Sequence, residues 1–287
     1  MTAMTCCSVD LTLTRIASSG FQLEESLDIY RELGDGRGTG WALHGLAVIM
    51  SQLGDLATAR SLCEEALLLS RTAGDRPAVA LELHGLGLLA MRQGDEQTAR
   101  SRVEESRQIW QELGDTEHLC LVSNILGDLA RLRGQYSEAV GHYRKCLELI
   151  GEQGPQGWRA LYLRNLGLAT YRVGDEQLAR QLLVEALVRF QELGDCRGVA
   201  ECVAGLACLA GKTEPERMAR LFGAATAAVE ALGPRLNPSH QADYDCSLAI
   251  ARRQLDNETF DAAWTQGRTL TLEQAVMEAL EESPQLS

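Results

Sequence analysis

Residues 74–113 read GDRPAVALELHGLGLLAMRQGDEQTARSRVEESRQIWQEL, a stretch in which two glycine–aspartate pairs each precede a run of helix-forming residues. Glycine lacks a Cβ and can adopt the left-handed conformation that closes the end of a helix. An aspartate next to it can cap the following helix by accepting its first N–H groups. The stretch therefore predicts two helices of about 15–17 residues that form an antiparallel hairpin.

The same turn signal recurs every 20 residues along the chain, and alternate copies differ, so the repeat unit has 40 residues. The glycines are Gly34, Gly54, Gly74, Gly94, Gly114, Gly134, Gly154, Gly174 and Gly194. Aspartates follow them at Asp35, Asp55, Asp75, Asp95, Asp115, Asp175 and Asp195. Such a period predicts an all-α solenoid, in which stacked hairpins cover each other's apolar faces.

A second set of positions keeps the 40-residue register. Leucine followed by a small residue occurs at Leu46, Leu86, Leu126, Leu166 and Leu206. Twelve residues later come Ala59, Ala99, Ala139, Ala179 and Ala219. Small residues let two helices approach closely, so these positions predict the contact between the two helices of each unit.

The leucine–small pair followed by this alanine resembles the tetratricopeptide repeat (TPR), whose period is 34 residues rather than 40. The motif's aromatic residue is replaced by Leu43, Leu83, Ser123 and Leu163. The longer unit resembles the C-terminal repeat region of bacterial STAND/LuxR-type ATPase transcriptional regulators, over about residues 21–232. The resemblance implies a right-handed superhelical solenoid of antiparallel helix hairpins, with a concave groove that binds a protein or an inducer.

Three segments follow from these patterns. Residues 1–20, with a strand-like alternation of Val9, Leu11 and Leu13, are expected to be loosely ordered. Residues 21–232 are expected to form the solenoid, a half unit plus five helix pairs. Residues 233–287 are expected to form a helical C-terminal cap and tail. The solenoid opens on an unpaired second helix at 22–33, which suggests a fragment or a free-standing homologue and an edge that can form a homodimer.

Composition narrows the function. The formal charge of −13 disfavours nucleic-acid binding, and no apolar stretch is long enough to span a membrane. Nine cysteines without a C-x-x-C motif indicate buried thiols in a cytoplasmic protein. No nucleophile elbow, zinc motif or phosphate-binding loop is present. We therefore predict a protein that is not an enzyme, with no catalytic residue, metal ligand or cofactor.

The equivalent inner positions of successive units supply the candidate binding residues of the groove. They are Trp41, His44, His84, Arg92, Asn124, Arg131, Arg164, Tyr171 and Arg172. Arginines inside an otherwise acidic molecule suggest a peptide ligand that carries acidic groups, because guanidinium pairs carboxylates bidentately. The alternative is that these arginines pair with neighbouring acids of the chain itself.

Two functions remain open. The first is a non-catalytic protein- or peptide-binding scaffold or sensor, taking part in bacterial transcription regulation or signalling. The second is a small-molecule sensor that binds an inducer in the groove, with Trp41, His44, His84 and Tyr171 as its lining.

Overall fold

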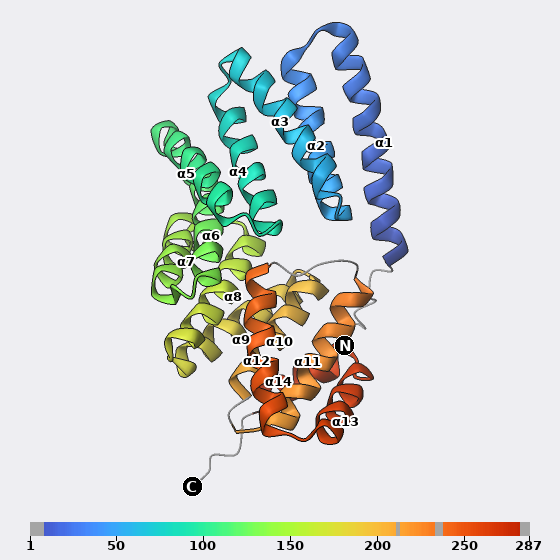
Figure 1. Cartoon of the computed structure of the whole chain (residues 1–287), viewed down its shortest axis with the longest axis vertical. Helices are drawn as coiled ribbons and strands as arrows, with labels where there is room; N and C mark the ends of the chain where they lie inside the picture. Colours follow the sequence, from blue (N-terminus) through green and yellow to red (C-terminus); the bar gives the residue numbers. More distant parts are fainter. Residues whose placement is uncertain (1–8, 211–212, 233–237, 282–287) are drawn as a thin grey trace. The chain divides into compact units, whose positions relative to one another are not determined.

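The computed structural model describes residues 9–210, 213–232 and 238–281 (Figure 1). These residues form 14 α-helices and no strand, which confirms the predicted all-α solenoid of antiparallel helix hairpins. They divide into two compact units, which we call the N-terminal unit (9–129) and the C-terminal unit (130–281). Each unit is described by itself below.

The N-terminal unit is built from consecutive helices that pack pairwise, α1 on α2, α2 on α3, α3 on α4 and α4 on α5. Their bounds are α1 Val9–Leu33, α2 Gly36–Leu53, α3 Leu56–Ala73, α4 Arg76–Arg92, α5 Glu96–Leu113 and α6 Thr116–Leu132, the last of which contains the boundary between the units. Helices α2 and α4 are the first helices of their repeat units and carry the candidate groove residues.

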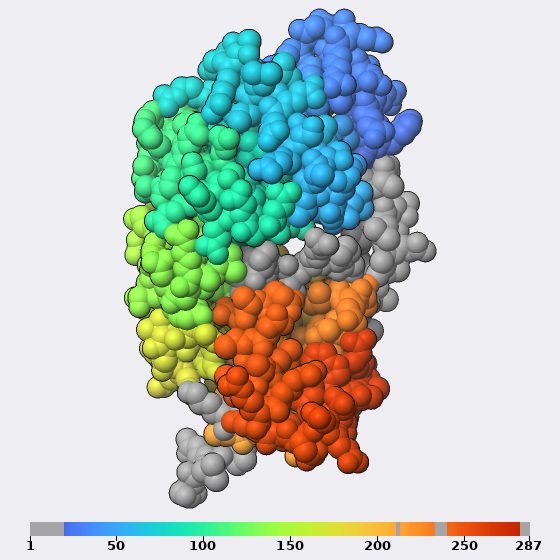
Figure 2. Space-filling model, in the orientation of Figure 1, coloured from blue at the N-terminus to red at the C-terminus, as the bar shows by residue number. Residues whose placement is uncertain are grey.

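In the C-terminal unit, consecutive helices from α7 to α11 pack pairwise, and three further helices follow. Its helices are α7 Tyr136–Ile150, α8 Gln156–Val173, α9 Glu176–Glu192, α10 Cys196–Ala210, α11 Pro215–Ala231, α12 Pro238–Gln254, α13 Asn257–Arg268 and α14 Leu272–Leu280. Helix α13 packs on α11, and α14 packs on both α10 and α11. In Figure 2 the orange and red residues of these last helices form one continuous surface of this unit.

The turns follow the predicted chemistry with one exception. Eight of the nine predicted glycines have a positive φ, and all seven aspartates accept a backbone N–H of the following helix. The exception is Gly154, because α7 ends at Ile150 and the left-handed residue is Gly151, with φ of 61°. Gly154 instead lies against the helix end, where a Cβ would come within 2.5 Å of the Ile150 carbonyl oxygen.

The small residues of the repeat are where the helices of a unit touch. All five predicted leucines are buried, and all five alanines have 0% of their surface exposed. A Cβ on Gly87 would lie 2.4 Å from Val103 Cγ2, and one on Gly167 would lie 2.9 Å from Leu183 Cγ. The cysteines expected inside helices are buried free thiols: Cys63, Cys120, Cys146, Cys202 and Cys208.

The N-terminal segment differs from expectation. Helix α1 begins at Val9, so residues 9–20 extend the helix expected at 22–33, and the alternation of Val9, Leu11 and Leu13 forms no strand. Residues 9–20 extend the helix towards the N-terminus, because each residue added to an existing helix forms one more backbone hydrogen bond. Residues 1–8 lie outside the described residues. None of the described helices is both long and apolar enough to cross a membrane.

Candidate functional site

The structure divides the nine candidate residues between the two units. Trp41, His44, His84, Arg92 and Asn124 belong to the N-terminal unit, and Arg131, Arg164, Tyr171 and Arg172 belong to the C-terminal unit. The two groups are therefore two candidate sites, each with its own surroundings.

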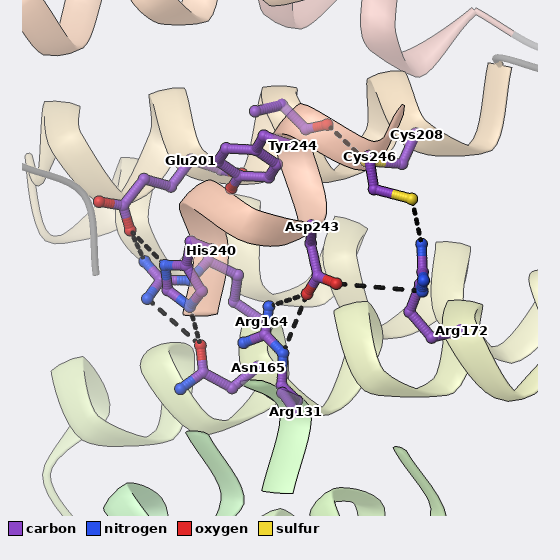
Figure 3. Close-up of polar contacts among 11 residues, drawn as sticks. Arg131, Arg164, Asn165, Arg172, Glu201, Cys208, His240, Asp243, Tyr244 and Cys246 are labelled. Carbon is purple, nitrogen blue, oxygen red and sulfur yellow. Dashed lines mark hydrogen bonds and ion pairs between the residues drawn. The ribbon is translucent and has the colours of Figure 1, made fainter. Parts of the chain in front are cut away.

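In the C-terminal unit, helix α12 covers the predicted arginines (Figure 3). Arg131 donates through Nε to Asp243 Oδ2 at 3.1 Å, and its Nη2 contacts the same oxygen. The side chains of Arg131 and Asp243 are 0% and 8% exposed. Arg172 Nε lies 3.9 Å from Asp243 Oδ1, so this carboxylate faces two guanidinium groups. The acidic group expected from a ligand is supplied here by the chain itself.

Arg164 pairs with an acid on a neighbouring inner helix rather than on α12. Its Nη1 contacts Glu201 Oε2 of α10, and its Nη2 donates to Asn165 Oδ1 at 3.3 Å. His240 of α12 joins this pair, because its Nε2 lies 3.0 Å from the same Asn165 oxygen. Tyr244 completes the contact by donating its hydroxyl to the Glu201 carbonyl oxygen at 3.0 Å. Arg131 and Arg164 thus pair with acids of this chain, as the alternative interpretation held.

Burial controls the protonation of this cluster. It lowers the pKa of His240 well below its usual value, and the nearby Arg164 and Arg131 lower it further. The imidazole is therefore neutral at pH 7 and adds no charge. Burial also raises the pKa of the Cys208 thiol to about 12. Among the charged groups of this cluster, Asp243 contacts Arg131 and Arg172, and Glu201 contacts Arg164.

In the N-terminal unit an open pocket of about 590 Å³ is lined by the first half of α2, the end of α3, the start of α4 and single residues of α5 and α6. Trp41 lines it with 63% of its surface exposed, and Leu81 and Trp110 add apolar walls. The Trp110 ring stacks on His118, with centroids 4.1 Å apart. Volumes of about 300–1,000 Å³ are typical of pockets that bind small molecules or an inserted side chain.

The polar floor of this pocket is a buried acid. Glu82 has a side chain only 3% exposed, and its Oε1 lies 2.9 Å from Nδ1 of His44. The equivalent positions of the other units are Ala42, Val122, Tyr162 and Cys202, all buried. A carboxylate costs free energy at a position where other units place an apolar side chain or a neutral polar one. Glu82 was not among the residues predicted from the sequence. It could have been found, because it is the one charged residue among the five equivalent repeat positions.

The other candidates lie outside both clusters. His84 does not line the pocket, and burial, together with His118 and His44, lowers its pKa to about 4. Arg92 donates to the Ser51 carbonyl and hydroxyl oxygens at 2.9 and 2.6 Å, which joins α4 to α2. Asn124 is half-buried, and Tyr171 packs against the core of the C-terminal unit.

The residues of α12 are the ones that sequence reasoning did not place. His240, Asp243 and Tyr244 lay in a segment expected to form a polar cap. The charge of Arg131, Arg164 and Arg172 predicts that acidic groups lie near them. The repeat pattern does not show which acids of the chain these are. Among the described residues no cluster of three or more His, Cys, Asp or Glu side chains has the arrangement of a metal site.

The fold and these two clusters define a helical-hairpin repeat protein whose distinctive polar groups lie on its inner helices. Models of the tetratricopeptide repeat match residues 39–73, 78–152 and 122–192, more than half of the chain. The chain therefore belongs to the tetratricopeptide repeat family.

Two solved structures show the same fold. The chain is similar to BtubC (BKLC) from P. vanneervenii, with 20% identity and a TM-score of 0.54 over 83% of this chain and 92% of that one. It is also similar to a Rap protein in complex with competence and sporulation factor, with 14% identity and a TM-score of 0.57 over 88% and 70% of the two chains. No curated protein sequence matches significantly.

Proposed function

We propose that this protein is a non-catalytic module that binds a protein or peptide on the inner face of its N-terminal unit. The observation that carries the proposal is the open pocket with Trp41 exposed among its lining residues. Val48, 43% exposed, extends the apolar surface along α2. A large aromatic side chain left in water is the kind of residue that dominates the binding energy of protein interfaces.

The repeat family supports this function, since helix-hairpin solenoids use their concave surfaces for binding. A Rap protein of the same fold, crystallised with competence and sporulation factor, supports the choice of a peptide-sized ligand. The ligand that fits the pocket is an extended or helical segment that inserts one apolar side chain beside Trp41. The polar groups His44 and Glu82 at the floor favour a segment that also brings a hydrogen-bond donor.

The test is selection of a random peptide library on the immobilised full chain, followed by calorimetry with the selected peptide. Trp41→Ala is expected to weaken binding at least about tenfold, the loss of one hot-spot residue. Leu68→Ala is the matched control, because Leu68 is 66% exposed on α3 of the same unit and does not line the pocket. Equal affinity of the Trp41→Ala variant for the peptide would contradict the proposal.

A second candidate ligand is a small-molecule inducer in the same pocket, favoured by its volume and by the buried Glu82. A metabolite that raises the thermal midpoint of the wild type but not of Glu82→Gln would support it. A peptide that competes with this metabolite would show that both use one site.

Two finer proposals concern the biological context. The 40-residue period, which resembles the repeat region of bacterial STAND/LuxR-type regulators, supports a role as the repeat region of such a transcriptional regulator or as a free-standing homologue of it. The sequence AAWTQGRTLTLEQAV at 262–276 adds support, because it resembles the C-terminal ends of the same regulators. Deleting its gene should change the transcript profile of the host, and an unchanged profile would contradict this role.

The exposed Phe21, Ile29 and Leu33 on α1 support a homodimer through this helix. Light scattering is expected to show a dimer that Phe21→Glu abolishes. A monomer at high concentration would contradict it.

A further inference from the structure

Helix α12 packs on the C-terminal unit through a face that contains several buried polar residues. Its buried residues recur at the spacing of one helix face: His240, Asp243, Tyr244, Ser247 and Ala251. His240, Asp243 and Ser247 are polar, whereas Tyr244 and Ala251 belong to the hydrophobic core, where the Tyr244 ring packs against Phe222 of α11. The buried face of α10 is instead made largely of Val199, Cys202, Val203 and Leu206. Polar contacts can be exchanged for equivalent contacts with another ligand, whereas buried apolar area has no substitute in water. Helix α12 is therefore the most replaceable helix of this unit.

The helices on either side of α12 hold each other without it. A Cβ on Gly223 of α11 would lie 2.3 Å from the Trp264 carbonyl oxygen of α13, and one on Gly267 would lie 1.9 Å from the Arg220 carbonyl oxygen. These backbones are in direct contact. Arg217 of α11 also donates to the carbonyl oxygen of Glu281, just after α14, at 2.6 Å. Releasing α12 would leave this packing intact.

Asp243 is shared between two of the arginines beneath α12, Arg131 and Arg172. Glu201 of α10 contacts the third, Arg164. The contacts of Arg172 with α12 are the Asp243 oxygen at 3.9 Å and the Cys246 thiol at 3.3 Å, and its guanidinium also lies 4.8 Å from the centroid of the Tyr136 ring. An occupant with a second carboxylate at the position of Cys246 would pair this arginine better.

We propose that α12 is an internal ligand, and that the surface beneath it binds an acidic helix of a partner protein. The helix that fits has a carboxylate at the position of Asp243, an aromatic ring at that of Tyr244 and a second carboxylate at that of Cys246. The first and last are three residues apart and lie on one helix face. Because α12 is tethered, it competes at an effective concentration in the millimolar range. Only a better-matched helix displaces it.

The test uses the full chain and a fluorescent synthetic peptide of residues 238–255, with anisotropy measured under reducing conditions. The Asp243→Ala substitution in the protein weakens the attachment of its own α12, which competes with the peptide. The variant protein is therefore expected to bind the peptide at least about tenfold more tightly than the wild type does. Asp245→Ala is the matched control, because Asp245 is exposed on the same helix and contacts only Gln241. It is expected to behave as the wild type.

The second half of the test uses substitutions in the peptide. Cys246→Glu in the peptide is expected to tighten binding to the Asp243→Ala protein by about tenfold, through a charge-assisted bond to Arg172. Asp243→Asn in the peptide is expected to lose most of the affinity. The proposal would be overturned if the Asp243→Ala protein folds but binds neither the wild-type peptide nor its two variants.

Hydrogen exchange on the wild type keeps the proposal testable if Asp243→Ala does not fold. The amides of α12 are expected to exchange at least about tenfold faster than those of α11 and α13, because α12 opens alone. Equal protection of the three helices would show that α12 is a permanent cap and would overturn the proposal.

Discussion

Gly87 and Gly141 are both interior residues of helices, yet their surroundings differ. A Cβ on Gly87 would lie 2.4 Å from Val103 Cγ2 and 3.3 Å from the Ala99 carbonyl oxygen, whereas one on Gly141 would meet nothing within 4 Å. Gly87→Ala is expected to lower the free energy of unfolding by about 1–3 kcal/mol, because the helices must separate. Gly141→Ala is expected to raise it by about 0.5–1 kcal/mol through helix propensity. Urea unfolding measures both, and a stabilised Gly87→Ala variant would contradict the close contact.

His84 provides a pH test at the same scale. Burial, together with His118 and His44, lowers the pKa of His84 to about 4 in the folded state, whereas the pKa of an unfolded histidine is near 6.5. Between these values the unfolded chain binds more protons, so stability falls as the pH decreases from about 6.5 towards 4. The thermal unfolding midpoint should decrease less between pH 7 and pH 5 in the His84→Gln variant than in the wild type. An identical loss in both proteins would contradict a lowered pKa.

At the scale of the element, the aspartate caps determine where helices begin. Asp95 accepts the Thr98 N–H at 3.0 Å, whereas Gln135 at the start of α7 makes no side-chain cap bond. Asp95→Ala is therefore expected to destabilise the protein by about 1 kcal/mol, and Gln135→Asp to stabilise it by up to about 1 kcal/mol. Thermal unfolding distinguishes the two. No gain from Gln135→Asp would mean that the α6–α7 turn does not present free N–H groups to this side chain.

Elements also show what the sequence could and could not predict. Turn chemistry is local, so the glycine–aspartate signal placed most helix ends correctly. It misplaced the end of α7, because Gly151 and Gly154 are both able to close a helix and the periodic signal selected the second. It also missed the role of α12, whose buried stripe of His240, Asp243 and Ser247 has the composition of a solvated face. Which acid meets Arg131 is a tertiary question that periodicity does not address.

At the scale of the whole molecule, the candidate binding residues are divided between the two units. The C-terminal unit fills its arginine cluster with its own helix, while the N-terminal unit leaves an apolar pocket open beside Trp41. The formal charge of the chain is −13, and the pocket beside Trp41 is lined by Leu81, Trp110 and the buried Glu82. The candidate residues were predicted individually from the repeat register. Their division into a filled site and an open one required the structure.

Hydrogen-exchange mapping of the full chain with a library-selected peptide tests the central claim most directly. The account predicts protection of α2 and α4 around Trp41 and Leu81, with the exposed face of α3 around Leu68 unchanged. A bound peptide that leaves both α2 and α4 unprotected would contradict binding at this pocket.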